Sequence, residues 1–111
     1  MPFLFALDAA LLSPAQATEI RCVALLALVS TEQARGVGWS EYPPLARDGA
    51  RFAGIVGEDV MNATGATRED VRDMIYAAAR ALKATPLDPP EVGRCVALMT
   101  TRAPAPATAP E

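Results

Sequence analysis

Residues 13–36, SPAQATEIRCVALLALVSTEQARG, decide the fold of this chain. Ser13 at the N-cap, Pro14 at the first helical position and Gln16 two positions later form a capping box, which predicts the start of a helix. Gly36 predicts its end, at about Arg35. Apolar residues of this helix occupy more than one of its faces, which is typical of the central helix of a small bundle.

Residues that start and end helices predict three further helices in the remaining sequence, around this one. We expect Pro43 and Pro44 to open a helix of about residues 44–63, Thr67 to cap one that runs to about residue 84, and Asp88 to cap a last short one. Three glycines interrupt the second helix, and we interpret their spacing as allowing a neighbouring helix to approach closely: Gly49, Gly54 and Gly57. The third helix has an apolar stripe that we expect to be buried: Val71, Met74, Ile75, Ala78 and Leu82.

Composition supports a single helical domain. The chain has 111 residues, of which 51% are hydrophobic, and 23 of these are alanines, which favour helices and disfavour strands. Residues 103–111 alternate alanine with proline and predict a disordered, extended tail. The sequence therefore predicts an all-α, four-helix bundle-like domain over residues 18–102, with a tail over 103–111.

Composition also limits the chemistry. The chain has no histidine, which excludes serine–histidine catalysis and histidine zinc sites, and its net charge of −3 argues against a nucleic-acid partner. The paired acids Glu58–Asp59 and Glu69–Asp70 fall on expected solvent faces. Acids precede arginines by three residues at four places, where we expect ion pairs on one helix surface: Glu32/Arg35, Asp48/Arg51, Glu69/Arg72 and Glu91/Arg94. We expect no catalytic, cofactor-binding or metal site. An acidic helix-turn-helix over residues 60–75 is a minor alternative.

Residues 1–17 fit two interpretations. Their apolar character, followed by Ala15-Gln16-Ala17, is typical of an export signal cleaved before Thr18, although Asp8 interrupts it and no basic residue precedes it. They also fit a short amphipathic N-terminal helix with Phe3, Leu7 and Leu11 on one face. Neither interpretation gives a segment long enough to span a membrane.

A repeated pentapeptide surrounds the two cysteines. Arg-Cys-Val-Ala-Leu occurs at residues 21–25 and again at 94–98, on two of the expected helices. If those helices are neighbours, a Cys22–Cys95 disulfide would remove roughly 4 kcal/mol of denatured-state freedom. The alternatives are two buried free thiols, as in many cytosolic proteins, and a redox or metal pair, for which further ligands are missing.

The residues from Arg21 to Gly36, the stretch Tyr42-Pro-Pro-Leu-Ala46, the cap near Thr67 and the late cysteine together resemble uncharacterised small exported two-cysteine helical proteins of GC-rich bacteria. The resemblance implies export and no particular activity.

The loop that follows the central helix is the candidate contact site. It contains Trp39, Tyr42, Pro43 and Pro44, and aromatic residues dominate interface hot spots. We therefore expect a non-catalytic protein that acts through protein–protein contacts, as an accessory or structural subunit in the periplasm or cell envelope. The alternative is a cytosolic adaptor with free cysteines, and a homo-oligomer fits either hypothesis.

Overall fold

The computed structural model describes residues 12–104, and these form four helices without a strand. They are α1 (Pro14–Ala34), α2 (Ala46–Thr64), α3 (Arg68–Leu82) and α4 (Pro89–Arg102). The predicted all-α, four-helix architecture is confirmed. The N-terminal leader or helix was expected over residues 1–17, of which residues 1–11 lie outside the described residues and residues 14–17 belong to α1. Of the tail expected over residues 103–111, residues 105–111 lie outside the described residues.

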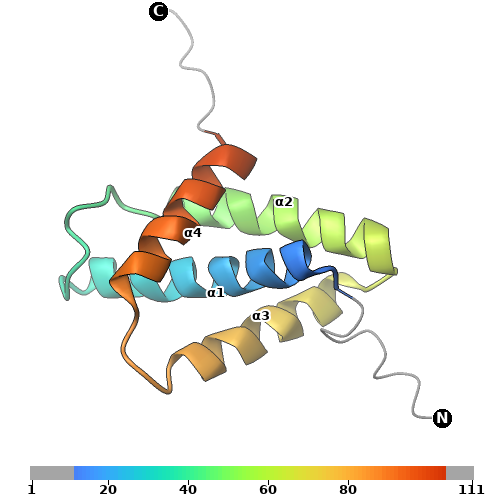
Figure 1. Ribbon diagram of the computed structural model, residues 1–111, viewed down its shortest axis with the longest axis horizontal. Helices are drawn as coiled ribbons and strands as arrows, with labels where there is room; N and C mark the ends of the chain where they lie inside the picture. The colour runs from blue at the N-terminus through green and yellow to red at the C-terminus, as the bar shows by residue number, and fades with distance from the viewer. Residues whose placement is uncertain (1–11, 105–111) are drawn as a thin grey trace, which may run out of the picture.

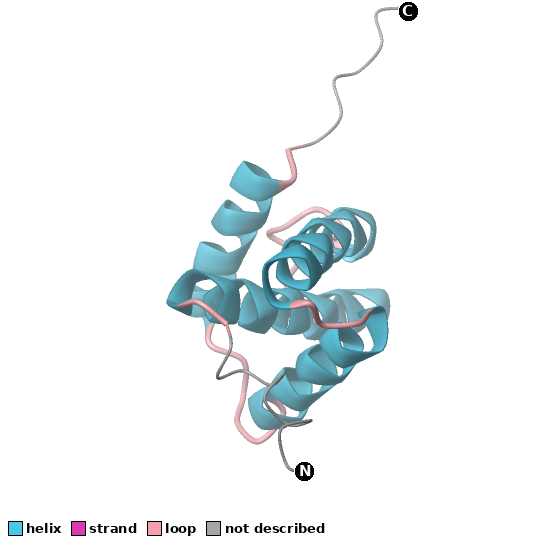
Figure 2. Ribbon diagram, turned by 90° about the vertical axis from the view of Figure 1, so that its right-hand side faces the viewer, coloured by secondary structure: helices cyan, strands magenta, loops and turns pink. Residues whose placement is uncertain are grey.

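Helix α1 is the centre of the domain and contacts each of the other three helices. Figure 1 shows it between α2 and α3, with α4 crossing it at a steep angle, and Figure 2 shows the same packing from the end. Because three neighbours surround α1, its buried side chains point in several directions, as its sequence predicts. They are Glu19, Ile20, Cys22, Val23, Ala24, Leu25, Leu26 and Val29.

Local capping residues begin three of the helices. The Ser13 hydroxyl accepts a hydrogen bond from the Gln16 backbone N–H, and the Gln16 side chain accepts one in return from the Ser13 N–H. Thr67 and Asp70 form the same reciprocal box at α3. The Asp88 carboxylate accepts from the backbone N–H three residues later at α4. All three starts agree with the sequence prediction.

The start of α2 differs from the prediction. The helix begins at Ala46, after an N-cap residue, Leu45, whose side chain makes no capping hydrogen bond. Pro43 and Pro44 therefore precede the helix instead of opening it. The helix ends at Gly65, whose φ of +77° is the left-handed conformation that commonly terminates helices.

The helices contribute to the core to different degrees. Residues with no more than 1% exposure come from α1, α2 and α4 and from the segment before α2; the largest are Phe52, Leu25, Leu26 and Leu45. On α3, Val71 and Leu82 are buried, whereas the other three members of its expected stripe, Met74, Ile75 and Ala78, are only half-buried. The predicted burial of these three is wrong in degree, because α3 lies at the side of the bundle and packs mainly on α1.

The glycines of α2 do not make the predicted close helix contact. A Cβ atom built on Gly49 or Gly54 would have no neighbour within 4 Å, and one on Gly57 would lie 3.6 Å from a Val71 methyl group, an ordinary contact distance. These residues weaken the helix without permitting any closer approach.

The helical domain extends one residue further than predicted. Ala103, which we assigned to the tail, is 3% exposed and belongs to the core. Within residues 12–104, no helix combines the length and the apolarity that crossing a membrane requires.

Candidate functional site

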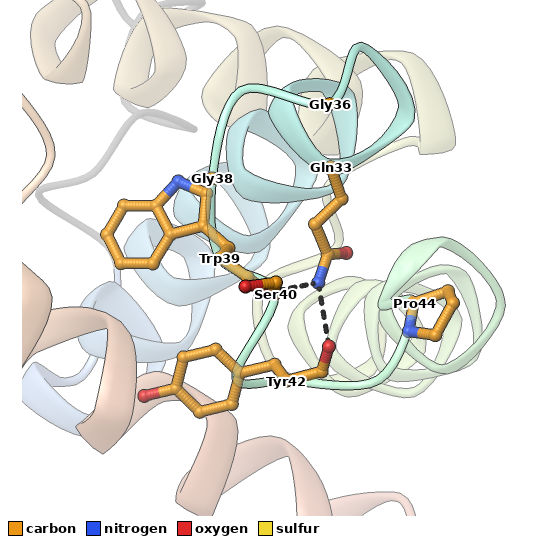
Figure 3. Close-up of a pocket in the computed structure, with 7 residues that line it drawn as sticks. All are labelled: Gln33, Gly36, Gly38, Trp39, Ser40, Tyr42 and Pro44. Carbon is orange, nitrogen blue, oxygen red and sulfur yellow. Dashed lines mark hydrogen bonds between the residues drawn. The ribbon is translucent and has the colours of Figure 1, made fainter.

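The loop between α1 and α2 is organised by one side chain, Gln33, in the last turn of α1. Its amide nitrogen lies within hydrogen-bond distance of the backbone carbonyl oxygens of Trp39 and Tyr42, at 3.1 and 3.3 Å (Figure 3), and of Pro43, at 3.1 Å. The two N–H groups of the amide share these three acceptors. Its amide oxygen accepts from the Leu45 N–H at 2.9 Å. A single carboxamide therefore fixes the backbone of the loop from Trp39 to Leu45.

The loop leaves α1 through a glycine turn. Gly36 has φ +71°, and its N–H donates to the Gln33 carbonyl, while the N–H of Val37 donates to the carbonyl of Glu32 at 2.9 Å. These two bonds form a Schellman motif, which satisfies carbonyls that the end of a helix would leave unpaired. The predicted stop at Gly36 is confirmed.

Trp39 is held in a conformation that non-glycine residues rarely adopt. Its φ is +64°, which costs about 1–2 kcal/mol for a side chain with a Cβ atom. Its indole N–H donates to the Glu32 carboxylate at 2.6 Å, and its carbonyl accepts from both Gln33 and the Tyr42 N–H. Strain of this kind persists only where surrounding contacts hold it, and it is frequent at functional sites.

An open pocket of about 420 Å³ lies on this loop, and we call it the aromatic pocket. It is lined by Gln33, Gly36, Gly38, Trp39, Ser40, Tyr42 and Pro44. The Trp39 and Tyr42 rings extend to the same side of the loop, and Pro44 lies across the Gln33 amide from them (Figure 3). Three of the four residues expected at a contact site therefore line one pocket. The fourth, Pro43, contributes its carbonyl to the Gln33 network.

Tyr42 connects the aromatic pocket to α4. A Cβ atom built on Gly93 would lie 3.4 Å from the Tyr42 hydroxyl oxygen, so the hydroxyl lies directly over the α4 backbone. Helix α4 also carries Cys95, so the helix that Tyr42 contacts is the one that the disulfide joins to α1.

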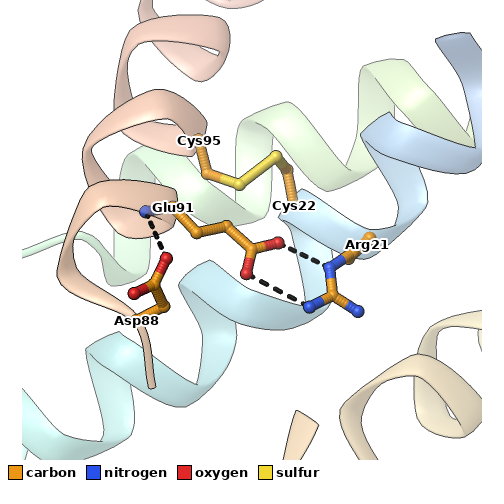
Figure 4. Close-up of a disulfide and its surroundings, with 5 residues drawn as sticks. All are labelled: Arg21, Cys22, Asp88, Glu91 and Cys95. Carbon is orange, nitrogen blue, oxygen red and sulfur yellow. Dashed lines mark hydrogen bonds and ion pairs between the residues drawn. A yellow bond between two sulfur atoms is a disulfide. The ribbon is translucent and has the colours of Figure 1, made fainter. Parts of the chain in front are cut away.

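Cys22 and Cys95 form a disulfide that joins α1 to α4 (Figure 4). The sulfur atoms are 2.07 Å apart and the Cα atoms 5.2 Å apart, the latter within the usual range for this bond. The two residues are 4% and 1% exposed. The structure thus brings together the two cysteines that the repeated pentapeptide singled out, in an environment that shields them from solvent.

An ion pair lies beside the disulfide. The Arg21 Nε and Nη2 atoms donate to the two Glu91 carboxylate oxygens at 2.5 and 3.1 Å (Figure 4). This bidentate hydrogen bonding raises the pKa of Arg21 and lowers that of Glu91, an effect that burial partly opposes. The expected pairing of Glu91 with Arg94 on its own helix is wrong, because α4 presents this carboxylate to α1.

Other charged pairs follow the sequence in part. Arg51 bonds Asp48 at 3.1 Å and Arg72 bonds Glu69 at 3.2 Å, as the spacing predicts. The expected pair of Glu32 with Arg35 does not form, since Glu32 binds the Trp39 indole.

Arg102 links three helices. Its guanidinium donates to Glu19 on α1 at 2.6 Å and to Asp59 on α2, and these two hydrogen bonds raise its pKa. Asp59 is exposed, as predicted, and it forms an ion pair with Arg102.

Sequence reasoning missed the role of Gln33. A signal was present, because Gln33 lies four residues after Val29 and seven after Leu26, which places it on the buried face of α1. A polar residue at such a position requires hydrogen-bond partners, and the loop backbone supplies them.

Comparisons with family models, with curated proteins and with solved structures give no match to this chain. Its function is therefore inferred from the aromatic pocket and the disulfide.

Proposed function

We propose that this chain is a non-catalytic helical protein that binds a protein partner through the aromatic pocket, as an accessory or structural subunit of an assembly in the bacterial envelope. The observation that carries the proposal is the Gln33 network, which holds Trp39 and Tyr42 in fixed positions at the edge of a pocket. Tryptophan and tyrosine are the residues that most often dominate the binding energy of an interface.

Rigidity of the loop favours binding. Association costs free energy when a flexible loop must be ordered, and a loop already fixed by hydrogen bonds avoids much of that cost. In this chain the cost of placing Trp39 with a positive φ is met on folding, by bonds from Glu32, Gln33 and Tyr42. The pocket is consequently prepared before a partner arrives.

The disulfide supports an oxidising compartment such as the periplasm, since such bonds are rare in the cytosol. The cytosolic alternative shares the same pocket and differs in the state of Cys22 and Cys95.

Ala15 and Ala17 of the expected cleavage site lie in the first turn of α1. Cleavage before Thr18 would remove the Ser13–Gln16 capping box, so an uncleaved chain retains a better start to α1.

Thiol labelling tests the compartment. Protein from the native host is denatured with a maleimide mass tag, with and without prior reduction, and its intact mass is measured. Export predicts no tag before reduction and two tags after it. Two tags without reduction would support the cytosolic alternative.

Site-specific cross-linking tests the contact. A photoreactive amino acid replaces Ser40 at the pocket rim, and a control chain carries it at Ala77, an exposed position on α3. We expect one defined protein, identified by mass spectrometry, to cross-link from Ser40 and not from Ala77. Equal yields from both positions, or none from Ser40, would contradict a binding role for the pocket.

A further inference from the structure

We propose that the aromatic pocket is completed only when Cys22 and Cys95 are oxidised, because the disulfide fixes the helix on which the Tyr42 ring rests. This inference rests on the proposed function and deepens it, since it names what controls the same site. The two aromatic walls of the pocket, the rings of Trp39 and Tyr42, lie against two different helices, and the disulfide joins those helices. The spacing between the walls therefore depends on this bond.

The Trp39 wall is attached to α1. Its indole N–H donates to the carboxylate of Glu32, in the last turn of α1, at 2.6 Å. Its carbonyl oxygen lies 3.1 Å from the amide nitrogen of Gln33 on the same helix. Since both partners belong to α1, we expect this wall to form with or without the disulfide.

The Tyr42 wall is supported by α4. The Tyr42 backbone is held by Gln33, but the ring extends toward α4 (Figure 3), where a Cβ atom on Gly93 would lie 3.4 Å from the hydroxyl oxygen. Alanine would just fit at this position, whereas a leucine side chain would compete with the ring for the same space. The position of the ring consequently follows the position of this part of α4.

The disulfide is the strongest attachment of the first half of α4, residues 89–95. Cys95 follows Gly93 by two residues, about 3 Å along the helix axis. This half of the helix also contributes Val92 to the core and Glu91 to the ion pair beside the disulfide (Figure 4). That pair adds little, because its arginine side chain is 51% exposed. Without the bond, the burial of two small side chains would hold this half on α1.

The second half of α4 is held independently of the disulfide. Arg102 donates hydrogen bonds to Glu19 on α1 and to Asp59 on α2. The Arg51 Nη2 atom donates to the carbonyl oxygen of Ala103, directly after the helix, at 2.9 Å. Loss of the disulfide should therefore loosen the half of α4 that supports the pocket and leave the other half packed.

Formation of the bond is a two-electron oxidation by a disulfide oxidant, R–S–S–R, such as oxidised glutathione or an oxidoreductase. One cysteine thiolate attacks the oxidant and releases R–SH, and the second cysteine then displaces the other R–SH and closes the Cys22–Cys95 bond. The two R–SH molecules carry away the two electrons and the two protons. In the folded chain the cysteines are 4% and 1% exposed, so thiols in solvent reach the bond poorly. We therefore expect oxidation to complete the pocket once, when the chain reaches an oxidising compartment. The free thiols of the cytosolic alternative would leave the Tyr42 wall without this support.

Nuclear magnetic resonance tests the support without a partner. In the oxidised chain we expect nuclear Overhauser contacts between the Tyr42 ring protons and the Gly93 α-protons. In the cysteine-free variant, Cys22→Ala with Cys95→Ala, these contacts should be lost. Circular dichroism should show that the helices remain, and the Trp39 indole N–H signal should keep its position. Unchanged Tyr42–Gly93 contacts in a helical cysteine-free variant would overturn the proposal.

A second variant keeps the disulfide and removes the support. Gly93→Leu places a bulky side chain next to the Tyr42 hydroxyl, and the control Ala97→Leu places the same side chain at an exposed position in the next turn of α4. We expect Gly93→Leu to reduce the yield of the Ser40 cross-link about tenfold, as the loss of one hot-spot ring would. Ala97→Leu should leave the yield unchanged. If the cysteine-free variant does not fold, an unchanged yield from Gly93→Leu would still overturn the proposal.

The two proposals fail separately. A partner that cross-links from Ser40 equally well in the oxidised chain and in the cysteine-free variant would leave the proposed function standing and remove this inference. Loss of the Tyr42–Gly93 contacts in that variant, with no partner cross-linked from Ser40 of the oxidised chain, would remove the proposed function and leave the dependence of the pocket on oxidation.

Discussion

The side-chain oxygen of Gln33 accepts a hydrogen bond from the backbone N–H of Leu45 at 2.9 Å, which ties the last turn of α1 to the residue that precedes α2. Leu45 has no side-chain group that could cap α2, and it is buried. The cap of one helix is thus supplied by another, and the same carboxamide holds the loop between them.

Replacing Gln33 by leucine removes this support. We expect Gln33→Leu to lower the free energy of unfolding by about 1–3 kcal/mol, because a partly buried N–H and several carbonyls lose their partner. Trp39 emission should shift as the loop loosens. The control is Gln16→Leu, which removes a capping bond at the exposed start of α1 and should leave Trp39 emission unchanged. An unshifted Trp39 in Gln33→Leu would refute the organising role.

The disulfide should contribute much of the stability. Cys22 and Cys95 are 73 positions apart, and in the chain-entropy model such a loop stabilises the fold by roughly 4 kcal/mol. We expect the double variant Cys22→Ala, Cys95→Ala to lose about this amount in urea unfolding. The unmodified chain under reductant should behave similarly, and an unchanged unfolding midpoint in both experiments would argue against the bond.

Local features of this fold could be predicted from the sequence. The caps at Ser13, Thr67 and Asp88 and the stop at Gly36 depend on residues within one helical turn, so spacing alone identifies them. The central position of α1 follows from its nearly all-round apolar surface. The two cysteines stood out because of the repeated pentapeptide.

Features that depend on helix packing could not be predicted. Glu91 has Arg94 three residues later and Arg21 seventy residues earlier, and the crossing of α4 over α1 selects Arg21. The cap of α2 likewise comes from a residue twelve positions before Leu45. The half-burial of Met74 depends on where α3 lies in the bundle, which no periodicity in its own sequence encodes.

The Arg21–Glu91 pair predicts an acid-sensitive contribution to stability. The pKa of Glu91 is lowered below its usual value of about 4.5, so its contribution is fully present above that pH. It is lost as the pH falls through the lower pKa of the folded state. We expect Glu91→Gln to be less stable than the unmodified chain at pH 7, with a difference that shrinks as the pH falls below 4.5.

Urea unfolding across pH 2.5–7 measures this difference. The control is Glu58→Gln on α2, which removes an exposed carboxylate that lies outside this ion pair. A Glu91→Gln deficit that stays constant over the whole range would show that packing, and not charge, explains it.

Arg102 should matter more than its exposure suggests. It is the cation that reaches Glu19, a carboxylate buried between helices, and it also binds Asp59. We expect Arg102→Met to lower the free energy of unfolding by about 1–3 kcal/mol, since a charged acceptor loses its partner. Arg94→Met, at an exposed position on the same helix, should cost less than about 0.5 kcal/mol. Equal effects of the two changes would contradict the network.

Replacement of Gly54 and of Gly65 by alanine should change the stability in opposite directions. Gly54 lies within α2 in open space, so Gly54→Ala adds a methyl group without a clash and should raise the stability by about 0.5–1 kcal/mol. Gly65 has equal space around it but a φ of +77°, so Gly65→Ala should lower the stability by about 1–2 kcal/mol. Because neither added methyl group meets another atom, thermal unfolding of the two variants separates backbone conformation from packing. Stabilisation by both substitutions would mean that the left-handed end of α2 is not maintained in solution.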